Sequence, residues 1–320
     1  MPLGEFDLIG RYFRRSSRRR DVLLGVGDDA ALLEVPPGRA LVAATDTLVE
    51  GRHFLPGAPP RSVGHQALAV NLSDLAAMGA EPAWALLSLS LPDPDERWLG
   101  AFADGFFALA DLHGVELVGG DTVRGPLVVT VEVLGFVAAA RALKRSGARP
   151  GDTLHVSGWL GESAAGLATM IRGAAGDTSD DPLVRRHLFA EPRLALGRAL
   201  AGIATSAMDV SDGLLGDLRK LCTASGVGAT LELDALPLSE ALRSRFPSEE
   251  CENFALHGGD DYELLFTLPA DCPVPGEPEP GAGGSPRLTC IGRITAGGGV
   301  RCTRGGVEVA ISGAGYDHFR

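Results

Sequence analysis

The residues that could do chemistry stand in five short segments, each of which places an aspartate beside Gly, Ser or Thr. Taken singly, such a segment is ordinary turn chemistry, because Asp caps helices and tolerates turn conformations. Taken together, the segments suit Mg²⁺, a hard cation that prefers oxygen ligands and shares phosphate oxygens with its substrate. The aspartates that would serve, if the fold brings them together, are Asp29, Asp46, Asp74, Asp121 and Asp209.

Two of these segments indicate more than a turn. Asp74 lies inside a helical pattern, where Asp is mildly unfavourable and needs another reason. Gly119 and Gly120 precede Asp121 and would let the backbone approach a ligand, so that their amides could contact phosphate. The chain has no Walker A segment and no kinase-type Gly-rich loop, so a phosphoryl-transfer enzyme would belong to neither common class.

Other candidate residues have open alternatives. Arg145 is either a solvated arginine or a guanidinium that reaches phosphates, and Asp212 could simply cap a helix at 213–225. A lone His53 is more often structural than catalytic. The basic run at 14–20 is either a solvated loop or a phosphate contact. The acid-rich segment 258–266 resembles another close-approach loop, and we expect the aromatic C-terminal segment 315–319 to dock against the body.

Composition limits the classes of protein that the chain can belong to. Its 320 residues, 45% apolar and 22% charged, predict a soluble globular protein of two domains. A net charge of -12 argues against nucleic acid or an anionic membrane as partner. An anionic substrate would therefore need local cations or bound metal. The five cysteines show no C-x-x-C spacing, and no signal peptide or membrane span is evident, so we expect a cytoplasmic protein.

The elements that must position these residues alternate along the chain, which predicts an α/β domain up to about residue 140. A turn-rich connection at 142–152 predicts the boundary, and the second half repeats the mixed pattern. We expect helices at 3–15, 61–79, 94–113, 161–173, 185–204 and 212–225, and strands at 40–48, 83–91, 126–138, 152–158, 228–233, 262–268 and 288–293.

The ordered motifs resemble those of the thiamine-monophosphate kinases. They are GDDAA, TDTLVEGRHF, NLSDLAAMGA, GGDT, SDGL, GGDDYEL and YDHF, and the resemblance extends from residue 4 to residue 319. It implies the two-domain α/β (α+β) fold of aminoimidazole ribonucleotide synthetase. Residues 1–140 would bind ATP and Mg²⁺ and form a dimer-spanning β-barrel with a second copy. Residues 148–320 would form a C-terminal α/β domain.

The resemblance also implies the reaction, in which a homodimer phosphorylates thiamine monophosphate to thiamine diphosphate with ATP. The implied Mg²⁺ ligands are Asp29, Thr45, Asp46, Asp74, Asp121, Asp209 and Asp212. The implied ATP contacts are Gly120, Asp121, Arg145 and Ser211, of which Asp121 and Arg145 would be catalytic. Thiamine monophosphate would contact His53, Asp260 and Tyr316.

Two positions depart from the family pattern. Residue 44 is Ala where the family often has Ser, so only its backbone carbonyl could bind metal. Residue 260 is Asp where Glu is usual, which keeps the carboxylate but shortens its reach. Because the acceptor is already an anion, we expect catalysis by charge neutralisation and in-line positioning, without a phosphoenzyme.

Two other functions remain as alternatives. One is another ATP-dependent synthetase of the same fold, such as selenophosphate synthetase. The absence of a cysteine near the N-terminus counts against that enzyme, since the first cysteine is Cys222. The other is a nucleotide-binding module without turnover, against which the intact aspartate set argues.

Overall fold

The computed structural model describes residues 4–173, 180–274 and 286–311, and these fall into two compact units. The N-terminal unit comprises residues 1–75 and 80–139, and the C-terminal unit comprises residues 76–79 and 140–320. The segment with Tyr316 lies outside the described residues.

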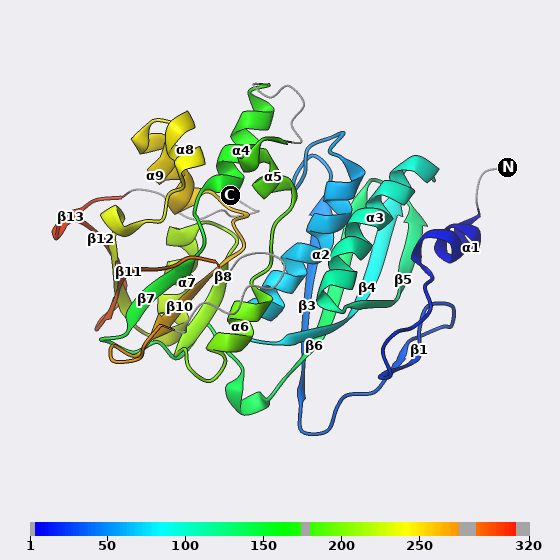
Figure 1. Ribbon diagram of the computed structural model, residues 1–320, viewed down its shortest axis with the longest axis horizontal. Helices are drawn as coiled ribbons and strands as arrows, with labels where there is room; N and C mark the ends of the chain where they lie inside the picture. The colour runs from blue at the N-terminus through cyan, green and yellow to red at the C-terminus, as the bar shows by residue number, and fades with distance from the viewer. Residues whose placement is uncertain (1–3, 174–179, 275–285, 312–320) are drawn as a thin grey trace. The chain divides into compact units, whose positions relative to one another are not determined.

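The N-terminal unit is built on an open four-stranded sheet in the order β3-β6-β4-β5, with α2 and α3 on one face (Figure 1). Alternating apolar residues explain this layer, since Leu87, Leu89, Val129 and Val131 are buried whereas Ser88 is exposed. The bounds are α1 Glu5–Leu8, a π-helix Ile9–Phe13, β1 Val22–Leu24, β2 Leu32–Leu33, β3 Ala40–Val49, α2 Pro60–Ala77, β4 Glu81–Leu91, α3 Glu96–His113, β5 Glu116–Arg124, β6 Val128–Val137 and a 3-10 turn Ala139–Arg141.

One strand of this sheet differs from the sequence expectation. The sequence predicts a turn at the GGDT segment, but this segment lies inside β5, which pairs in parallel with β4 along its whole length. Two adjacent glycines and an aspartate have low strand propensity, so the segment gives no local strand signal. The neighbouring β4 determines its conformation instead.

The C-terminal unit contains a seven-stranded sheet in the order β13-β12-β9-β11-β7-β10-β8, antiparallel except for the β9–β12 pair (Figure 1). Its main core includes Leu154, Val210, Leu218 and Leu265. The bounds are β7 Thr153–Ser157, α4 Glu162–Ile171, α5 Pro182–Leu188, α6 Leu194–Leu200, β8 Ser206–Val210, α7 Leu214–Ser225, β9 Gly228–Glu232, a 3-10 turn Leu233–Ala235, α8 Glu240–Arg245, α9 Ser248–His257, β10 Glu263–Leu268, β11 Leu288–Thr295, β12 Gly299–Arg304 and β13 Val307–Val309.

The helix expected at 185–204 is wrong as a single element. It is divided into α5 and α6, and the intervening residues 190–193 have no regular structure. Pro192 accounts for the break, because it lacks an amide hydrogen and its ring clashes with a helical backbone. The strand β8, which carries Asp209, had no counterpart in the sequence expectation.

Among the residues that the structure describes, no helix combines the length and apolar character that a membrane crossing requires.

Candidate functional site

Two of the predicted metal ligands of the N-terminal unit, Asp46 and Asp121, lie on different strands of its sheet. Asp46 is in β3 and is aligned, strand by strand, with Val131, Leu87 and Gly120. The row beside it consists of Thr47, Thr130, Ser88 and Asp121. Because neighbouring residues of a strand point to opposite faces, Asp46 belongs to the face of the buried Val131, and Asp121 to that of the exposed Ser88.

The two aspartates also stand at opposite edges of the sheet. β3 and β5 are its outer strands, with β6 and β4 between them. Three strand spacings separate Asp46 from the Asp121 segment, about 14 Å along the sheet. Direct ligands of one Mg²⁺ each lie about 2.1 Å from the ion. Within one sheet of this shape, Asp46 and Asp121 therefore belong to different binding positions.

Residue 120 must be a glycine because of its backbone conformation and its close approach to β4. Its φ is 145°, and a Cβ added there would come within 1.8 Å of the Leu87 carbonyl oxygen. The adjacent Asp121 is exposed and forms no salt bridge with any described residue. The glycine thus has a steric role against β4 and leaves its neighbour at the edge of the sheet, where a ligand could reach it.

The remaining candidates of this unit have distinct surroundings. Asp29 is exposed in the turn between β1 and β2, where its own amide donates to the Asp28 carboxylate at 2.9 Å. Asp74 lies in α2 and is partly exposed. Thr45 donates its hydroxyl to the carbonyl of Val131 at 3.1 Å.

His53 follows β3 in a tight turn. Its Nδ1 accepts a hydrogen bond from the amide of Val49 at 3.0 Å. The neutral ring therefore carries its proton on Nε2, which makes that atom a donor. Such a fixed tautomer suits a contact with an anionic ligand.

In the C-terminal unit, the predicted residues Asp209, Ser211 and Asp212 follow one another at the end of β8. Asp209 is buried, and Ser211 and Asp212 form the turn into α7. The amides of both turn residues donate to one oxygen of Asp217 at 3.0 Å. Asp217 is fully buried in the first turn of α7, so this acid fixes the backbone on which two candidate ligands stand.

Asp212 is already paired with a cation. Lys220 lies 2.5 Å from its carboxylate and 2.8 Å from that of Asp217. Burial raises the pKa of Asp217, and Lys220 acts in the opposite direction without reversing the effect. A metal ion at Asp212 would therefore compete with the lysine. Of the two roles open to Asp212, the N-cap is excluded, because Gly213 occupies the N-cap position of α7.

The loop with Asp260 is joined to the same turn. The amide of Asp260 donates to the carbonyl of Ser211, and the amide of Tyr262 donates to that of Val210, both at 2.9 Å. The Tyr262 hydroxyl donates to the Asp260 carboxylate at 3.0 Å. The C-terminal unit thus brings Asp209, Ser211, Asp212 and Asp260 into one neighbourhood.

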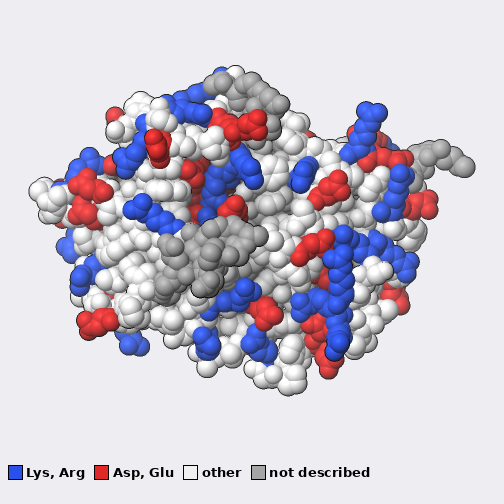
Figure 2. All heavy atoms as spheres, viewed as in Figure 1, with Lys and Arg blue, Asp and Glu red and all other residues white. Residues whose placement is uncertain are grey.

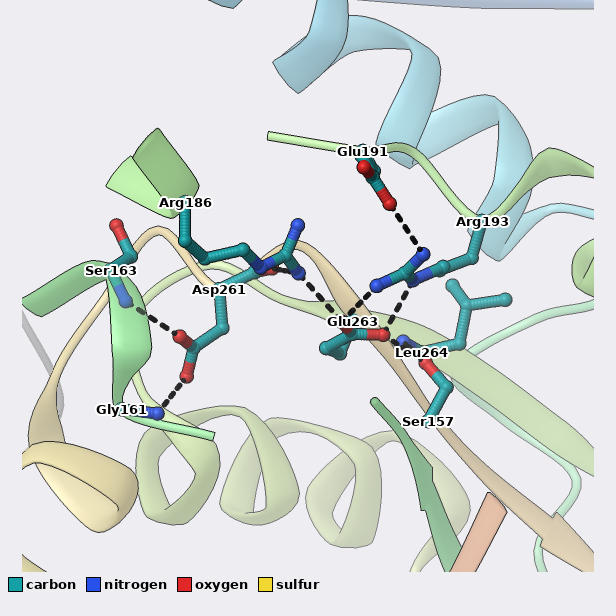
Figure 3. A network of polar contacts seen from close by, with 9 residues as sticks. All are labelled: Ser157, Gly161, Ser163, Arg186, Glu191, Arg193, Asp261, Glu263 and Leu264. Atoms are coloured by element: carbon teal, nitrogen blue, oxygen red, sulfur yellow. Dashed lines mark hydrogen bonds and ion pairs between the residues drawn. The ribbon is translucent and has the colours of Figure 1, made fainter. Parts of the chain in front are cut away.

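The other two acids of the GGDDYEL segment have structural roles. Asp261 is fully buried and accepts hydrogen bonds from the amides of Gly161 and Ser163 at the start of α4 (Figure 3). Burial raises the pKa of Asp261 to about 8. Glu263 is also fully buried and pairs with two arginines. Only Asp260 of the three is open to solvent in part.

Arg145 is exposed in the connection between β6 and β7. The loop around it is held by Ser225 at the end of α7, whose hydroxyl donates to the Arg145 carbonyl at 3.1 Å. The Ser225 hydroxyl oxygen in turn accepts hydrogen bonds from the amides of Gly147 and Ala148, both at 3.2 Å. The guanidinium therefore projects from a fixed backbone.

The basic run at 14–20 is mostly neutralised by acids. Arg15 and Arg18 pair with Asp111 at 3.2 and 3.1 Å, and Arg19 pairs with Asp21 at 2.7 Å. Figure 2 shows basic side chains beside acidic ones on the side of the view where Figure 1 draws α3 and β1. The two contacts with Asp111 tie the basic run to α3.

The described residues include no group of three or more His, Cys, Asp or Glu side chains already arranged to hold a metal ion. Sequence reasoning missed the polar residues that surround the turns on which the candidate ligands stand, namely Ser157, Arg186, Arg193, Asp217, Lys220 and Ser225. Of these, only Asp217 and Lys220 carried a local signal, because they are three residues apart on one helix.

Comparison with known proteins gives two family matches that together cover most of the chain. Residues 27–137 match the N-terminal domain of AIR synthase related proteins, and residues 149–271 match the C-terminal domain. The chain therefore has the two-domain α/β fold of that family.

Individual relatives are similar over the full length. The thiamine-monophosphate kinase of Escherichia coli K12 is 50% identical over 100% of this chain and 99% of its own. A crystal structure of the kinase from Stenotrophomonas maltophilia K279a is 44% identical, with a TM-score of 0.85 and coverage of 97% and 99%. A structure of AaThiL complexed with AMPPCP and TMP is 34% identical, with a TM-score of 0.79 and coverage of 92% of both chains.

Proposed function

The chain belongs to the thiamine-monophosphate kinases, and we propose that it transfers the γ-phosphate of ATP to thiamine monophosphate. The observation that carries this proposal is the 50% identity to the Escherichia coli kinase along the whole chain. The AaThiL complex adds that a 34% identical protein of the same fold binds AMPPCP and TMP together. The sequence identity to these kinases and the share of the chain that they cover favour this reaction over those of the synthetases that share the fold.

The donor set supports Mg²⁺ as the partner of ATP. The proposed ligands present only carboxylate and hydroxyl oxygens, the atoms that this ion prefers. When bound, Mg²⁺ would neutralise charge on the phosphates during transfer. Asp29, Asp46 and Asp121 are exposed to solvent, and Asp212 is paired with Lys220, which a bound ion would displace. The proposed set is Asp29, Thr45, Asp46, Asp74, Asp121, Asp209 and Asp212.

The chain's own residues would align the two anions. We place ATP against Gly120, Asp121, Arg145 and Ser211, with Arg145 donating to phosphate oxygens as only a guanidinium can in a planar fork. The acceptor is a phosphate monoester, largely ionised near neutral pH, and needs no general base. Direct in-line transfer therefore requires orientation and charge balance rather than a protein nucleophile.

Three residues are proposed to hold thiamine monophosphate. His53 offers an Nε2 donor, as its Nδ1 is engaged by Val49. Asp260 is positioned by the Ser211 and Val210 carbonyls through its own amide and that of Tyr262. Tyr316 belongs to the C-terminal segment outside the described residues, and its role rests on the resemblance alone.

We propose a homodimer in which the N-terminal units close a barrel across both copies. Support comes from the open sheet, whose edge strands β3 and β5 carry Asp46 and Asp121. A second copy whose β5 meets β3 would bring the strand that carries its Asp121 beside the strand that carries the Asp46 of the first. The N-terminal unit would then serve dimerisation and ATP–Mg²⁺ binding together.

Cytoplasmic localisation belongs to the same proposal. The five cysteines are all free thiols, with Cys222, Cys251 and Cys302 buried. Reduced thiols are typical of proteins that work in a reducing compartment.

A coupled assay for ADP tests the proposed reaction. With ATP, Mg²⁺ and thiamine monophosphate, ADP formation should depend on the acceptor. If ADP forms equally fast without thiamine monophosphate, the kinase proposal is wrong. Thiamine without a phosphate is the matched control and should give only the background rate.

A further inference from the structure

A buried carboxylate beside the proposed substrate loop is held by two arginines rather than one. Glu263 begins β10 and is fully buried. Its Oε1 accepts from Arg193 Nη2 at 2.5 Å and from Arg186 Nη2 at 2.6 Å. Its Oε2 accepts from Arg193 Nε at 2.7 Å and from the Ser157 hydroxyl at 2.5 Å (Figure 3).

The two arginines differ in what else they touch. Arg193 donates to both oxygens of Glu263 and so neutralises the buried carboxylate. It also pairs with Glu191. Arg186 gives Glu263 a single hydrogen bond, and the same Nη2 atom donates to the carbonyl of Asp261 at 2.7 Å. Of this pair, therefore, Arg186 is the one that ties the carboxylate to the loop backbone.

The backbone is in an unfavourable conformation at the residues on both sides of Asp261. Asp260 and Tyr262 have φ angles of 65° and 48°, in the left-handed region that residues with a Cβ avoid. Their amides are held by Ser211 and Val210, and the side chain of Asp261 is held by the first amides of α4. Arg186 holds the carbonyl of the residue between the two, and so completes the set of contacts that maintains the turn.

The helix that supplies Arg186 also contacts α4, near the amides that hold Asp261. The next residue of α5, His187, hydrogen-bonds to the Ser163 hydroxyl at 3.0 Å. Burial lowers the pKa of His187, and the negative charge of Asp260 acts against this, so the two side chains lie within electrostatic reach. Helix α5 thus contacts the Asp261 backbone through Arg186 and the start of α4 through His187.

We propose that Arg186 is a positioning residue, which holds the Asp260–Tyr262 turn so that Asp260 can bind thiamine monophosphate. This inference rests on the proposed function, because it concerns the loop that would meet the acceptor. Arg186 acts through Asp261 and Glu263 and does not itself bind substrate. The structure assigns Arg193 the different task of neutralising Glu263.

The pair offers a matched test, because Arg186→Met and Arg193→Met each remove one cation from the same carboxylate. Arg186→Met should raise the KM for thiamine monophosphate on the order of tenfold, the effect of losing one charge-assisted hydrogen bond. The KM for ATP should change less than about twofold. Arg193→Met should lower stability at least as much and leave the KM for thiamine monophosphate within about twofold of the wild type.

A conservative variant checks the geometry. Both hydrogen bonds of Arg186 come from one nitrogen, so the ammonium of Arg186→Lys can make either of them and should recover part of the loss. Should Arg186→Met not fold, comparing Arg186→Lys with Arg193→Lys decides the same question. Equal increases in the KM for thiamine monophosphate from the two positions would overturn the inference.

Hydrogen exchange separates this inference from the proposed function. Amides of residues 258–262 should exchange faster in Arg186→Met than in Arg193→Met, compared at equal global stability. If the wild type does not phosphorylate thiamine monophosphate but this difference is found, the kinase proposal fails and the tie between Arg186 and the turn stands. If the kinase is active and neither exchange nor KM distinguishes the two variants, the inference fails alone.

Discussion

Individual carboxylates in this protein differ in what already neutralises them. Asp121 is exposed and unpaired among the described residues, Asp212 has Lys220 as a partner, and Glu263 has two arginines. An acid that is already paired and buried contributes to the fold, whereas an exposed and unpaired acid at a strand edge is available to a cation. This difference distinguishes Asp121, a candidate ligand, from Glu263, which supports the fold.

Asp121→Asn should abolish turnover and leave folding stability nearly unchanged. The side chain is exposed, and removing one negative charge from a strongly acidic chain relieves repulsion in the absence of metal. Steady-state kinetics and urea unfolding without metal check both parts. A loss of several kcal/mol in the metal-free unfolding free energy would identify Asp121 as a structural residue instead.

Gly120→Ala should destabilise the protein even though glycine is replaced by the smallest alternative. The added Cβ would lie 1.8 Å from the Leu87 carbonyl oxygen, and the φ of 145° is strained for alanine. We expect a loss of about 2 kcal/mol or more in the free energy of unfolding. Chemical denaturation measures it, with Gly151→Ala as a control that shares a positive φ of 100° but has open space around it. Equal losses at the two positions would contradict the steric explanation.

Residue types identified the candidate ligands from the sequence, because Asp beside Gly, Ser or Thr is a local signal. The supporting residues could not be found in this way. Arg186 and Glu263 are 77 positions apart, and Asp261 reaches amides about 100 positions away. The segment 258–266 was interpreted as a ligand loop, yet two of its three acids are buried within the fold. Nothing local distinguishes Asp260 from its neighbour.

At the scale of elements, two turns carry the candidate residues of the C-terminal unit. The turn from β8 to α7 is held by Asp217, and the turn from α9 to β10 is held by Arg186, Asp261 and Glu263. Backbone hydrogen bonds join the two turns directly. Loosening either one should therefore disturb the other.

The Glu263 network predicts a pH-dependent contribution to stability. Burial raises the pKa of Glu263, but the charges of Arg193 and Arg186 outweigh it and hold the pKa below its ordinary value of 4.5. An acid whose pKa is lowered by folding stabilises the protein above its unfolded pKa, and this stability is lost as the pH falls through the lowered folded-state value.

Glu263→Gln should accordingly cost about 3–5 kcal/mol at neutral pH, since it leaves two arginines without their counter-ion. The difference in unfolding free energy between wild type and variant should shrink as the pH falls below about 4. Urea unfolding at several pH values measures it. A difference that stays constant from neutral to acidic pH would contradict the ion-pair account.

Elements with strong apolar patterns were predicted well, and those without them were not. The expected strand at 40–48 is observed as β3, and the expected helix at 94–113 is observed as α3. The strand β5 was missed because its two glycines carry no strand signal, and its conformation comes from pairing with β4. The break between α5 and α6 could have been predicted from Pro192.

At the scale of the whole molecule, the proposed homodimer would join β5 of one copy to β3 of the other, so that residues of both copies would line each phosphate site. Mixing Asp46→Asn with Asp121→Asn should then restore activity that neither variant has alone. In a mixed dimer one of the two shared sites keeps both aspartates, so a random mixture should recover about a quarter of wild-type activity.

The mixing experiment requires exchange of subunits, which a tagged copy can verify. Asp121→Asn mixed with itself is the control and should stay inactive. If verified mixed dimers remain inactive, Asp46 and Asp121 do not complete a site across the dimer.

Direct detection of the phosphorylated product tests the central claim. ATP labelled in its γ-phosphate, Mg²⁺ and thiamine monophosphate are incubated with the wild-type protein, and the label is followed into thiamine diphosphate and protein. We predict one labelled thiamine diphosphate for each ADP formed and no labelled protein. Labelled inorganic phosphate without thiamine diphosphate, or ADP formation that ignores the acceptor, would contradict the account.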